Sequence, residues 1–326
     1  MKCTNRIVVF LSIISLLFST GCASKGELPC KFERNSSSSS VSVSDSSSLY
    51  VYAEPFAENL CVDECLYVEN VNLDSAYAAG LFDINSDRVL YGQNMYETMT
   101  PASITKLLTV LVTLKYYDYD KMLTFTKESE ITESGAQKIG FKEGDTITVE
   151  QALNILLVFS ANDVAMMLAN GYDEGYDAFI AKMNEEAKML GATNTNFVNP
   201  HGLTEDGHET SVYDLYLILN ELMKYDKFKE IVSSPGYTTS YTQADGTIKT
   251  IELNSTNMYI NGSHETPEGY TVLGGKTGTT MAAGKCLIIL FKDNESNPYI
   301  ACILRAEDYD LLYSDMDKLI TAVNRK

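Results

Sequence analysis

Ser103 and Lys106 carry the first pattern of side chains in this chain that could do chemistry. On a helix, a hydroxyl and an amine at this spacing lie on one face, one turn apart. A lysine whose pKa is lowered by burial or by a second cation can act as the base that activates a serine nucleophile. In the first helical turn, the backbone N–H of Ser103 would also be an unpaired donor, suited to half of an oxyanion hole. The pair alone is weak evidence, because a serine three residues before a lysine occurs by chance in most proteins of this size.

Ser160 and Asn162 form a second pattern, where a helical run over 151–159 breaks before it resumes at 163–169. A hydroxyl and an amide at such a turn could shuttle a proton and hold a substrate carbonyl. Taken alone, these residues favour a simpler interpretation, in which Asn162 and Asp163 cap the next helix.

Lys276, Thr277 and Gly278 form a third pattern, which Thr279 follows. A cation and hydroxyls at a strand edge can bind a carboxylate, and the glycines allow a substrate backbone to approach closely. The segment is not a phosphate-binding loop, because Gly269 stands six residues before Gly275, where that loop requires five.

These residues need elements to hold them. Apolar, aromatic runs over 77–84 and 88–91 predict a hairpin around Asn85-Ser86-Asp87. A helix is expected over 101–117, with Thr100 as N-cap and Pro101 in the first turn. The pattern from about 120 to 230 is mostly helical, most clearly over 151–169, 176–190 and 211–223. From Gly236 onward strands dominate, over 269–275, 285–292 and 299–305, and a last helix is expected over 309–324. The class predicted is α+β, with a sheet assembled from N- and C-terminal segments.

The composition excludes several classes of protein. The 326 residues carry 44 Asp and Glu against 25 Lys and Arg, a formal charge of −19, so nucleic acid is not an expected partner. An apolar share of 45% is enough for a packed core. Only three histidines are present, without zinc-type Cys/His spacing, so no metal ion or other cofactor is expected.

The N-terminus is typical of an export signal over residues 1–21. Lys2 and Arg6 precede an apolar run over 7–18, and Ser19-Thr20-Gly21-Cys22 resembles the lipobox of bacterial lipoproteins, in which the cysteine is lipidated. An ordinary secretory cleavage nearby, leaving Cys22 as a spare thiol, is the alternative. Ten of the 13 residues over 36–48 are serine, which predicts a flexible tether within a lead-in over 22–74. The expected location is the outer face of the cell membrane, or otherwise secreted. The folded domain is placed at 75–326.

The order of the three patterns resembles the triple signature of penicillin-recognising serine enzymes, with separations of 57 and 116 residues. Further segments resemble the D-alanyl-D-alanine carboxypeptidase family, the low-molecular-mass penicillin-binding proteins, over roughly 75–322: Pro101-Ala102-Ser103, Ser160-Ala161-Asn162-Asp163, Met183-Asn184, Leu190-Gly191-Ala192, Thr195-Asn196-Phe197, Asn199-Pro200-His201-Gly202-Leu203 and Gly274-Gly275-Lys276-Thr277-Gly278-Thr279. The resemblance implies a β-lactamase/transpeptidase-like fold.

The resemblance also implies a mechanism. Ser103 would attack the carbonyl between the two terminal D-alanines of a peptidoglycan stem peptide, and Lys106 would take its proton. The N–H groups of Ser103 and Thr279 would hold the oxyanion, and Ser160 would relay a proton to the leaving amine. Substrate would be bound by Asn162, Lys276, Thr277, Gly278 and Thr279. β-Lactams would acylate Ser103, and the charge of Lys276 would help to keep Lys106 neutral.

Some features depart from the family. Only 48 residues follow Gly278, so the C-terminal β-domain of many relatives is not expected. The arginine that relatives often carry near the substrate carboxylate has no clear equivalent, and Arg305 is a doubtful candidate. His201 is expected to be structural. Cys61 and Cys65 lie outside any motif, and Cys286 and Cys302 are either a bridge between neighbouring strands or two separate buried thiols.

Three other functions stay open. A class A β-lactamase would need a Glu-x-x-Leu-Asn motif after Ser160, whereas Glu150-Gln-Ala-Leu-Asn154 precedes it and is interpreted as coincidence. A non-catalytic wall-binding protein would not need intact motifs. A DD-endopeptidase that cuts cross-links is not distinguishable from a carboxypeptidase by sequence.

Overall fold

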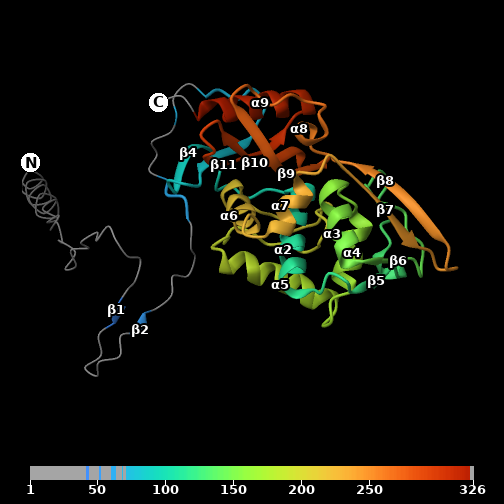
Figure 1. Ribbon diagram of the computed structural model, residues 1–326. Coiled ribbons are helices and arrows are strands. Elements are labelled where there is room, and N and C mark those ends of the chain that lie inside the picture. The colour runs from blue at the N-terminus through green and yellow to red at the C-terminus, as the bar shows by residue number, and fades with distance from the viewer. Residues whose placement is uncertain (1–41, 44–50, 53–59, 64–67, 69–70, 324–326) are drawn as a thin grey trace, which may run out of the picture. The chain divides into compact units, whose positions relative to one another are not determined.

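A computed structural model describes residues 42–43, 51–52, 60–63, 68 and 71–323 (Figure 1). The chain divides into two compact units, Met1–Pro55 and Phe56–Lys326. In the first unit, strands β1 (Ser42–Val43) and β2 (Val51–Tyr52) pair antiparallel. The signal peptide, Cys22 and most of the serine-rich tether lie outside the described residues, so these expectations stay predictions.

The second unit is built on an antiparallel sheet of five strands in the order β4-β3-β11-β10-β9. The predicted hairpin forms β3 (Ala78–Asp83) and β4 (Arg88–Gln93). The predicted C-terminal strands form β9 (Tyr270–Thr280), β10 (Gly284–Asp293) and β11 (Pro298–Ala306). Because β3 pairs with β11, segments from both ends of the domain share one sheet. The predicted α+β class is confirmed.

Both faces of this sheet are buried. Successive side chains of a strand point to opposite faces. In β10, Ile288 and Leu290 belong to the larger core between the sheet and most of the helices. Leu287 and Ile289 belong to a smaller core beneath α9 (Tyr309–Ala322). Figure 1 shows α9 on one side of the sheet and the main group of helices on the other.

Helix α2 (Lys106–Tyr116) forms the centre of the helical layer, and all of its residues from Lys106 to Leu114 are buried. A helix that is buried all round needs neighbours on every side. It is surrounded by α3 (Val149–Val158), α4 (Asn162–Asn170), α5 (Tyr176–Met189) and α6 (Val212–Leu222). Shorter helices are α7 (Asp226–Val232), α8 (Met258–Asn261) and η2 (Lys127–Ser129). No described helix has the length and apolarity needed to cross a membrane.

The start of the predicted helix at 101–117 differs from expectation. The chain enters α2 through a 3₁₀ turn, η1 (Ala102–Thr105), and Thr100 does not cap it. Thr100 Oγ1 is buried and has no hydrogen-bond partner among the described residues. The reason is the positive φ of Ala102, 49°, which turns the chain between Thr100 and the first helical N–H groups.

A second sheet, in the order β5-β6-β7-β8, lies at the far end of the helical layer (Figure 1). Its strands are β5 (Met122–Thr124), β6 (Thr146–Thr148), β7 (Gly236–Thr242) and β8 (Ile248–Asn254). The expectation of a mostly helical region over 120–230 misses β5 and β6. Three-residue strands are too short to show an alternation of apolar and polar residues.

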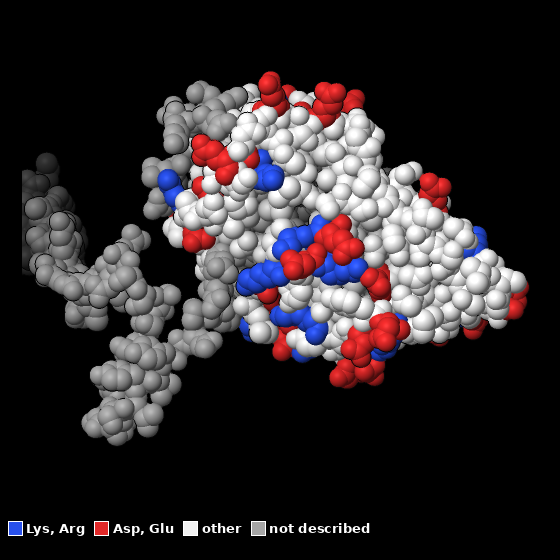
Figure 2. Space-filling model, viewed as in Figure 1, with Lys and Arg blue, Asp and Glu red and all other residues white. Residues whose placement is uncertain are grey.

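The surface drawn in Figure 2 interleaves cations with acids rather than collecting cations into a patch. Lys227 lies 2.5 Å from Glu150, and Lys229 lies 2.5 Å from Asp226. Surface ion pairs of this kind stabilise a fold only slightly.

The described cysteines are free thiols. Cys286 on β10 and Cys302 on β11 are both buried in the larger core and are not bonded to each other. The sequence left open a bridge between neighbouring strands or two separate buried thiols, and the structure shows two separate buried thiols. Cys61 is also free and buried, and Cys65 lies outside the described residues.

Asp315 on α9 joins the beginning of the described domain to its end. Its carboxylate has no exposed surface and accepts hydrogen bonds from the backbone N–H groups of Asp74, Ser75 and Ala76 at 2.8, 2.9 and 3.0 Å. Lys318 lies 3.0 Å from the same carboxylate. Burial raises the pKa of Asp315, but these donors outweigh burial and lower it below its ordinary value.

We expect Asp315→Asn to destabilise the protein by about 2 kcal/mol at pH 7, because a neutral amide leaves buried donors without a charged acceptor. The folded-state pKa of Asp315 is lowered, so its contribution is present at neutral pH and is lost as the pH falls through that value. Urea unfolding at pH 7 and pH 3 measures how much unfolding free energy the variant loses at each pH. Asp173→Asn, at a carboxylate with 86% of its side chain exposed, is the control and should change little. If Asp315→Asn destabilised the protein as much at pH 3 as at pH 7, the account would be contradicted.

Candidate active site

The turn that carries Ser103 is held against two glycine-containing segments. A Cβ on Gly278 of β9 would lie 2.8 Å from Pro101 O and 3.0 Å from Ser103 N. A Cβ on Gly202, whose φ is +86°, would lie 1.9 Å from Ala102 O. Real side chains do not fit at such distances, so both positions need glycine for the backbones to come this close. The approach brings β9 next to the nucleophile.

Lys106 is completely buried and its amine has three neighbours. Lys106 Nζ lies 2.8 Å from Ser103 Oγ, 2.7 Å from Asn162 Oδ1 and 2.6 Å from the carbonyl oxygen of His201. A neutral amine has two N–H donors and one lone pair. The two carbonyl oxygens can only accept and therefore take the two N–H groups. The lone pair is left for the hydroxyl of Ser103, which is the arrangement that a general base requires.

The electrostatics of the site favour this neutral form. The pKa of Lys106 is well below its ordinary value, first because burial penalises the charge and then because Lys276 is close. The buried carboxyl group of Asp163 acts in the opposite direction. Burial also lowers the pKa of Lys276, to about 7. A proton on Lys276 therefore favours the neutral form of Lys106.

Ser160 and Asn162 lie at the break between α3 and α4, as predicted. Ser160 has a positive φ of 68°, a strained backbone for a residue other than glycine. Lys276 Nζ donates to Ser160 Oγ and to Thr277 O, both at 2.8 Å. Asn162 is the first residue of α4, whose N-cap is Ala161, and its side chain is turned to Lys106. The simpler interpretation, that Asn162 serves as a helix cap, is therefore wrong.

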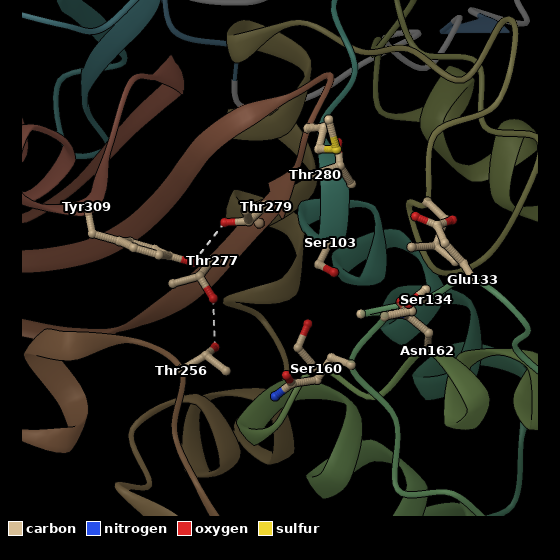
Figure 3. A pocket seen from close by; sticks show the side chains of 16 residues that line it. Ser103, Glu133, Ser134, Ser160, Asn162, Thr256, Thr277, Thr279, Thr280 and Tyr309 are labelled. Carbon is tan, nitrogen blue, oxygen red and sulfur yellow. Dashed lines mark hydrogen bonds between the residues drawn. The ribbon is translucent and has the colours of Figure 1, made fainter.

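The predicted residues surround one cavity of about 370 Å³ (Figure 3). Six of them line it: Ser103, Ser160, Asn162, Thr277, Gly278 and Thr279. Lys106 and Lys276 are buried beneath it, where their amines contact the hydroxyls of Ser103 and Ser160. Every predicted site residue in the domain is thus brought together, and only the predicted lipidation site Cys22 lies outside the described residues.

The sequence did not indicate several other lining residues. The loop over 133–137 forms one wall. It is held at Gln137 O, which accepts from Asn162 N at 2.8 Å, and just beyond it by Asp163, which accepts from Ile139 N and Gly140 N at 3.2 and 2.8 Å. Thr256 reaches Thr277 Oγ1 at 2.6 Å from the opposite wall. Tyr309 also lines the cavity, whereas Arg305 does not, because its guanidinium lies 5.4 Å from the centre of the Tyr77 ring.

His201 is structural, as expected. Its ring Nδ1 accepts a hydrogen bond from Leu203 N at 3.1 Å, and burial lowers its pKa to about 3. Asn199 Oδ1 accepts from Gly202 N at 2.7 Å and holds the same loop. The function of this loop in the site is to point the backbone carbonyl of His201, rather than its ring, at Lys106.

The comparison with known proteins agrees with this geometry. The chain is similar to the Streptomyces K15 DD-transpeptidase, with a TM-score of 0.71 and 25% identity over 78% of this chain and 98% of that one. The fold is thus that of a penicillin-binding serine enzyme. The profile of the D-alanyl-D-alanine carboxypeptidase family, peptidase S11, matches residues 68–308, and the chain belongs to this family.

Two curated relatives carry different names. D-alanyl-D-alanine carboxypeptidase DacF of Bacillus subtilis is 35% identical over 216 residues, which are 65% of this chain and 53% of the relative. A D-alanyl-D-alanine endopeptidase of Pseudomonas aeruginosa is 31% identical over 215 residues, 66% of each chain. The chain thus spans about half the length of DacF.

We expect Lys276→Met to shift the rising limb of the acylation rate of Ser103 to higher pH. Without the second cation the pKa of Lys106 rises, so a larger fraction of its amine is protonated and inactive. The difference in acylation rate between the variant and the unaltered protein should be largest below pH 7. It should shrink above pH 7, where Lys276 in the unaltered protein loses its own proton.

A fluorescent penicillin measures this rate as a function of pH, normalised for each variant. Lys188→Met, at an exposed lysine, is the control and should keep the original profile. An unchanged midpoint in Lys276→Met would contradict the electrostatic coupling.

Proposed function

We propose that this protein is a serine-type D-Ala-D-Ala carboxypeptidase that removes the terminal D-alanine from peptidoglycan stem peptides. The observation that carries the proposal is the amine of Lys106, whose two N–H groups are engaged by Asn162 Oδ1 and His201 O. Its lone pair is thereby directed at Ser103 Oγ, 2.8 Å away. Membership of the carboxypeptidase family supports the same reaction.

The first step is acylation. Ser103 Oγ attacks the carbonyl carbon of the penultimate D-alanine while its proton moves to Lys106 Nζ. The oxyanion is placed between the backbone N–H groups of Ser103 and Thr279, on the turn and the strand that Gly278 allows to approach each other. Ser160 passes its proton to the leaving amine of the terminal D-alanine and regains one from Lys276 Nζ, which donates to it at 2.8 Å. Water then hydrolyses the acyl-enzyme, and β-lactams acylate Ser103 in the same way.

The remaining side chains bind the substrate. Asn162 lines the cavity and uses Oδ1 for Lys106, which leaves its amide Nδ2 for the acyl carbonyl of the substrate. Thr277, Gly278 and Thr279 line the side of the cavity that receives the terminal carboxylate, and the charge of Lys276, buried beneath them, favours an anion there.

A β-lactamase is disfavoured by the position of Glu150. Its carboxylate lies 2.5 Å from Lys227 in a surface ion pair and does not line the cavity. The DD-endopeptidase remains the alternative, because a relative of similar identity carries that name. A non-catalytic wall-binding function is disfavoured, because the catalytic side chains are all present and in contact.

The carboxypeptidase predicts a covalent penicillin adduct on Ser103 and release of D-alanine from a pentapeptide. Intact-protein mass spectrometry should find one adduct in the unaltered protein and none in Ser103→Ala. Hydrolysis of a pentapeptide should exceed hydrolysis of a cross-linked dimer. Faster cleavage of the dimer would favour the endopeptidase, and an adduct that survives in Ser103→Ala would contradict the proposed nucleophile.

The N-terminus is proposed to anchor the protein to the outer face of the cell membrane through a lipid on Cys22. The lipobox-like Ser19-Thr20-Gly21-Cys22 and the serine-rich segment that follows support this proposal. Radiolabelled fatty acid should enter the protein in cells and should not enter Cys22→Ser. Equal labelling of both would overturn the anchor, and the catalytic proposal does not depend on it.

A further inference from the structure

Tyr309 is the first residue of α9, and its hydroxyl reaches the cavity. Tyr309 Oη lies 2.8 Å from Thr279 Oγ1, and the two side chains point toward each other in Figure 3. The bulge between β10 and β11 precedes this helix, and Arg305 takes a positive φ of 57° there. A bulge of this kind re-aims the chain that follows it. Here it turns the guanidinium of Arg305 to Tyr77, and α9 then places Tyr309 beside Thr279.

Lys285 lies behind the ring of Tyr309. It is the cross-strand partner of Thr279 in the pairing of β10 with β9, so the two side chains share one face of the sheet. Lys285 Nζ lies 4.5 Å from the centre of the Tyr309 ring. A cation at this distance over a ring is attracted by the ring quadrupole and draws electron density from it. The phenol hydroxyl is thereby made a stronger hydrogen-bond donor.

The direction of the bond between the two hydroxyls follows from this polarisation. Two hydroxyls have two protons, and the bond between Tyr309 and Thr279 uses one of them. A phenol is a better donor than an alcohol, and the cation of Lys285 increases the difference. Tyr309 therefore donates to Thr279, and the proton of Thr279 is left to point into the cavity.

We propose that Tyr309, polarised by Lys285, is a positioning residue that directs the hydroxyl proton of Thr279 at the C-terminal carboxylate of the substrate. The inference rests on the proposed function, in which this side of the cavity binds that carboxylate. Among the lining residues of the described structure there is no lysine or arginine. The ammonium of Lys276 is directed to Ser160 Oγ and Thr277 O. Selectivity for an anion at this edge therefore depends on Thr279 and on the two side chains behind it, Tyr309 and Lys285.

The test compares two peptides that differ only at the C-terminus, a D-Ala-D-Ala carboxylate and the corresponding carboxamide. Tyr309→Phe keeps the ring and removes the hydroxyl. We expect it to lower kcat/KM for the carboxylate peptide about tenfold, mainly through KM, because a hydrogen bond to a charged group is weakened. Lys285→Gln should cause a smaller loss of about threefold, the size expected of an exposed cation–π contact, and Lys285→Arg should restore activity.

Binding measurements separate positioning from a structural effect. In a Ser103→Ala background, the Kd of each peptide is followed by NMR shift titration. The preference for carboxylate over carboxamide should fall in Tyr309→Phe and in Lys285→Gln, while the Kd of the carboxamide stays unchanged. An unchanged preference in Tyr309→Phe would overturn the proposal, and so would equal weakening of both peptides. An unchanged preference in Lys285→Gln would overturn the part assigned to Lys285.

The chain supplies a matched control pair outside the cavity. Tyr77 also has a cation over its ring, Arg305, and donates its hydroxyl to Glu97 at 2.8 Å. Tyr77→Phe and Arg305→Gln should leave both peptides unaffected, and a loss equal to that of Tyr309→Phe would overturn the proposal. If the unaltered protein released no D-alanine and took no penicillin adduct, the proposed function itself would fail. If it did both while Tyr309→Phe kept its preference, only the positioning role would fail.

Discussion

One buried amine is the interaction on which the rest of the site depends. Lys106 Nζ contacts Ser103, Asn162 and the carbonyl of His201, which belong to the 3₁₀ turn, the start of α4 and the loop over 199–203. A charged ammonium without a counterion is costly to bury, and the neutral amine is not. The fold therefore selects a state of Lys106 that accepts a proton from Ser103 instead of donating one to it.

Much of the surrounding structure brings Ser103, Lys106 and their hydrogen-bond partners into contact. Gly202 and Gly278 let two backbones reach the turn that carries Ser103. The ring of His201 is used to shape its loop, and Asp163 fixes the loop that closes the opposite wall. Lys276, whose own pKa burial lowers to about 7, adds a second cation close enough to lower the pKa of Lys106.

The sequence indicated the motif residues because their chemistry and spacing are local, and the main sheet because its strands are long apolar runs. It could not indicate Tyr309 or the loop over 133–137, since their place in the cavity depends on a bulge at Arg305 and on hydrogen bonds to Asp163. The expected cap at Thr100 was wrong because a positive φ at Ala102 is not visible in the residue type. Strands β5 and β6 of the small sheet were missed because each is only three residues long.

The protonation state of Lys106 tests the account most directly. In protein labelled with ¹³C-lysine, the Cε resonance of Lys106, assigned by its absence from Lys106→Met, can be followed as the pH is raised. The account predicts a transition far below the ordinary lysine pKa of 10.5. A Lys106 resonance that shows no transition until the pH reaches that ordinary value would contradict it.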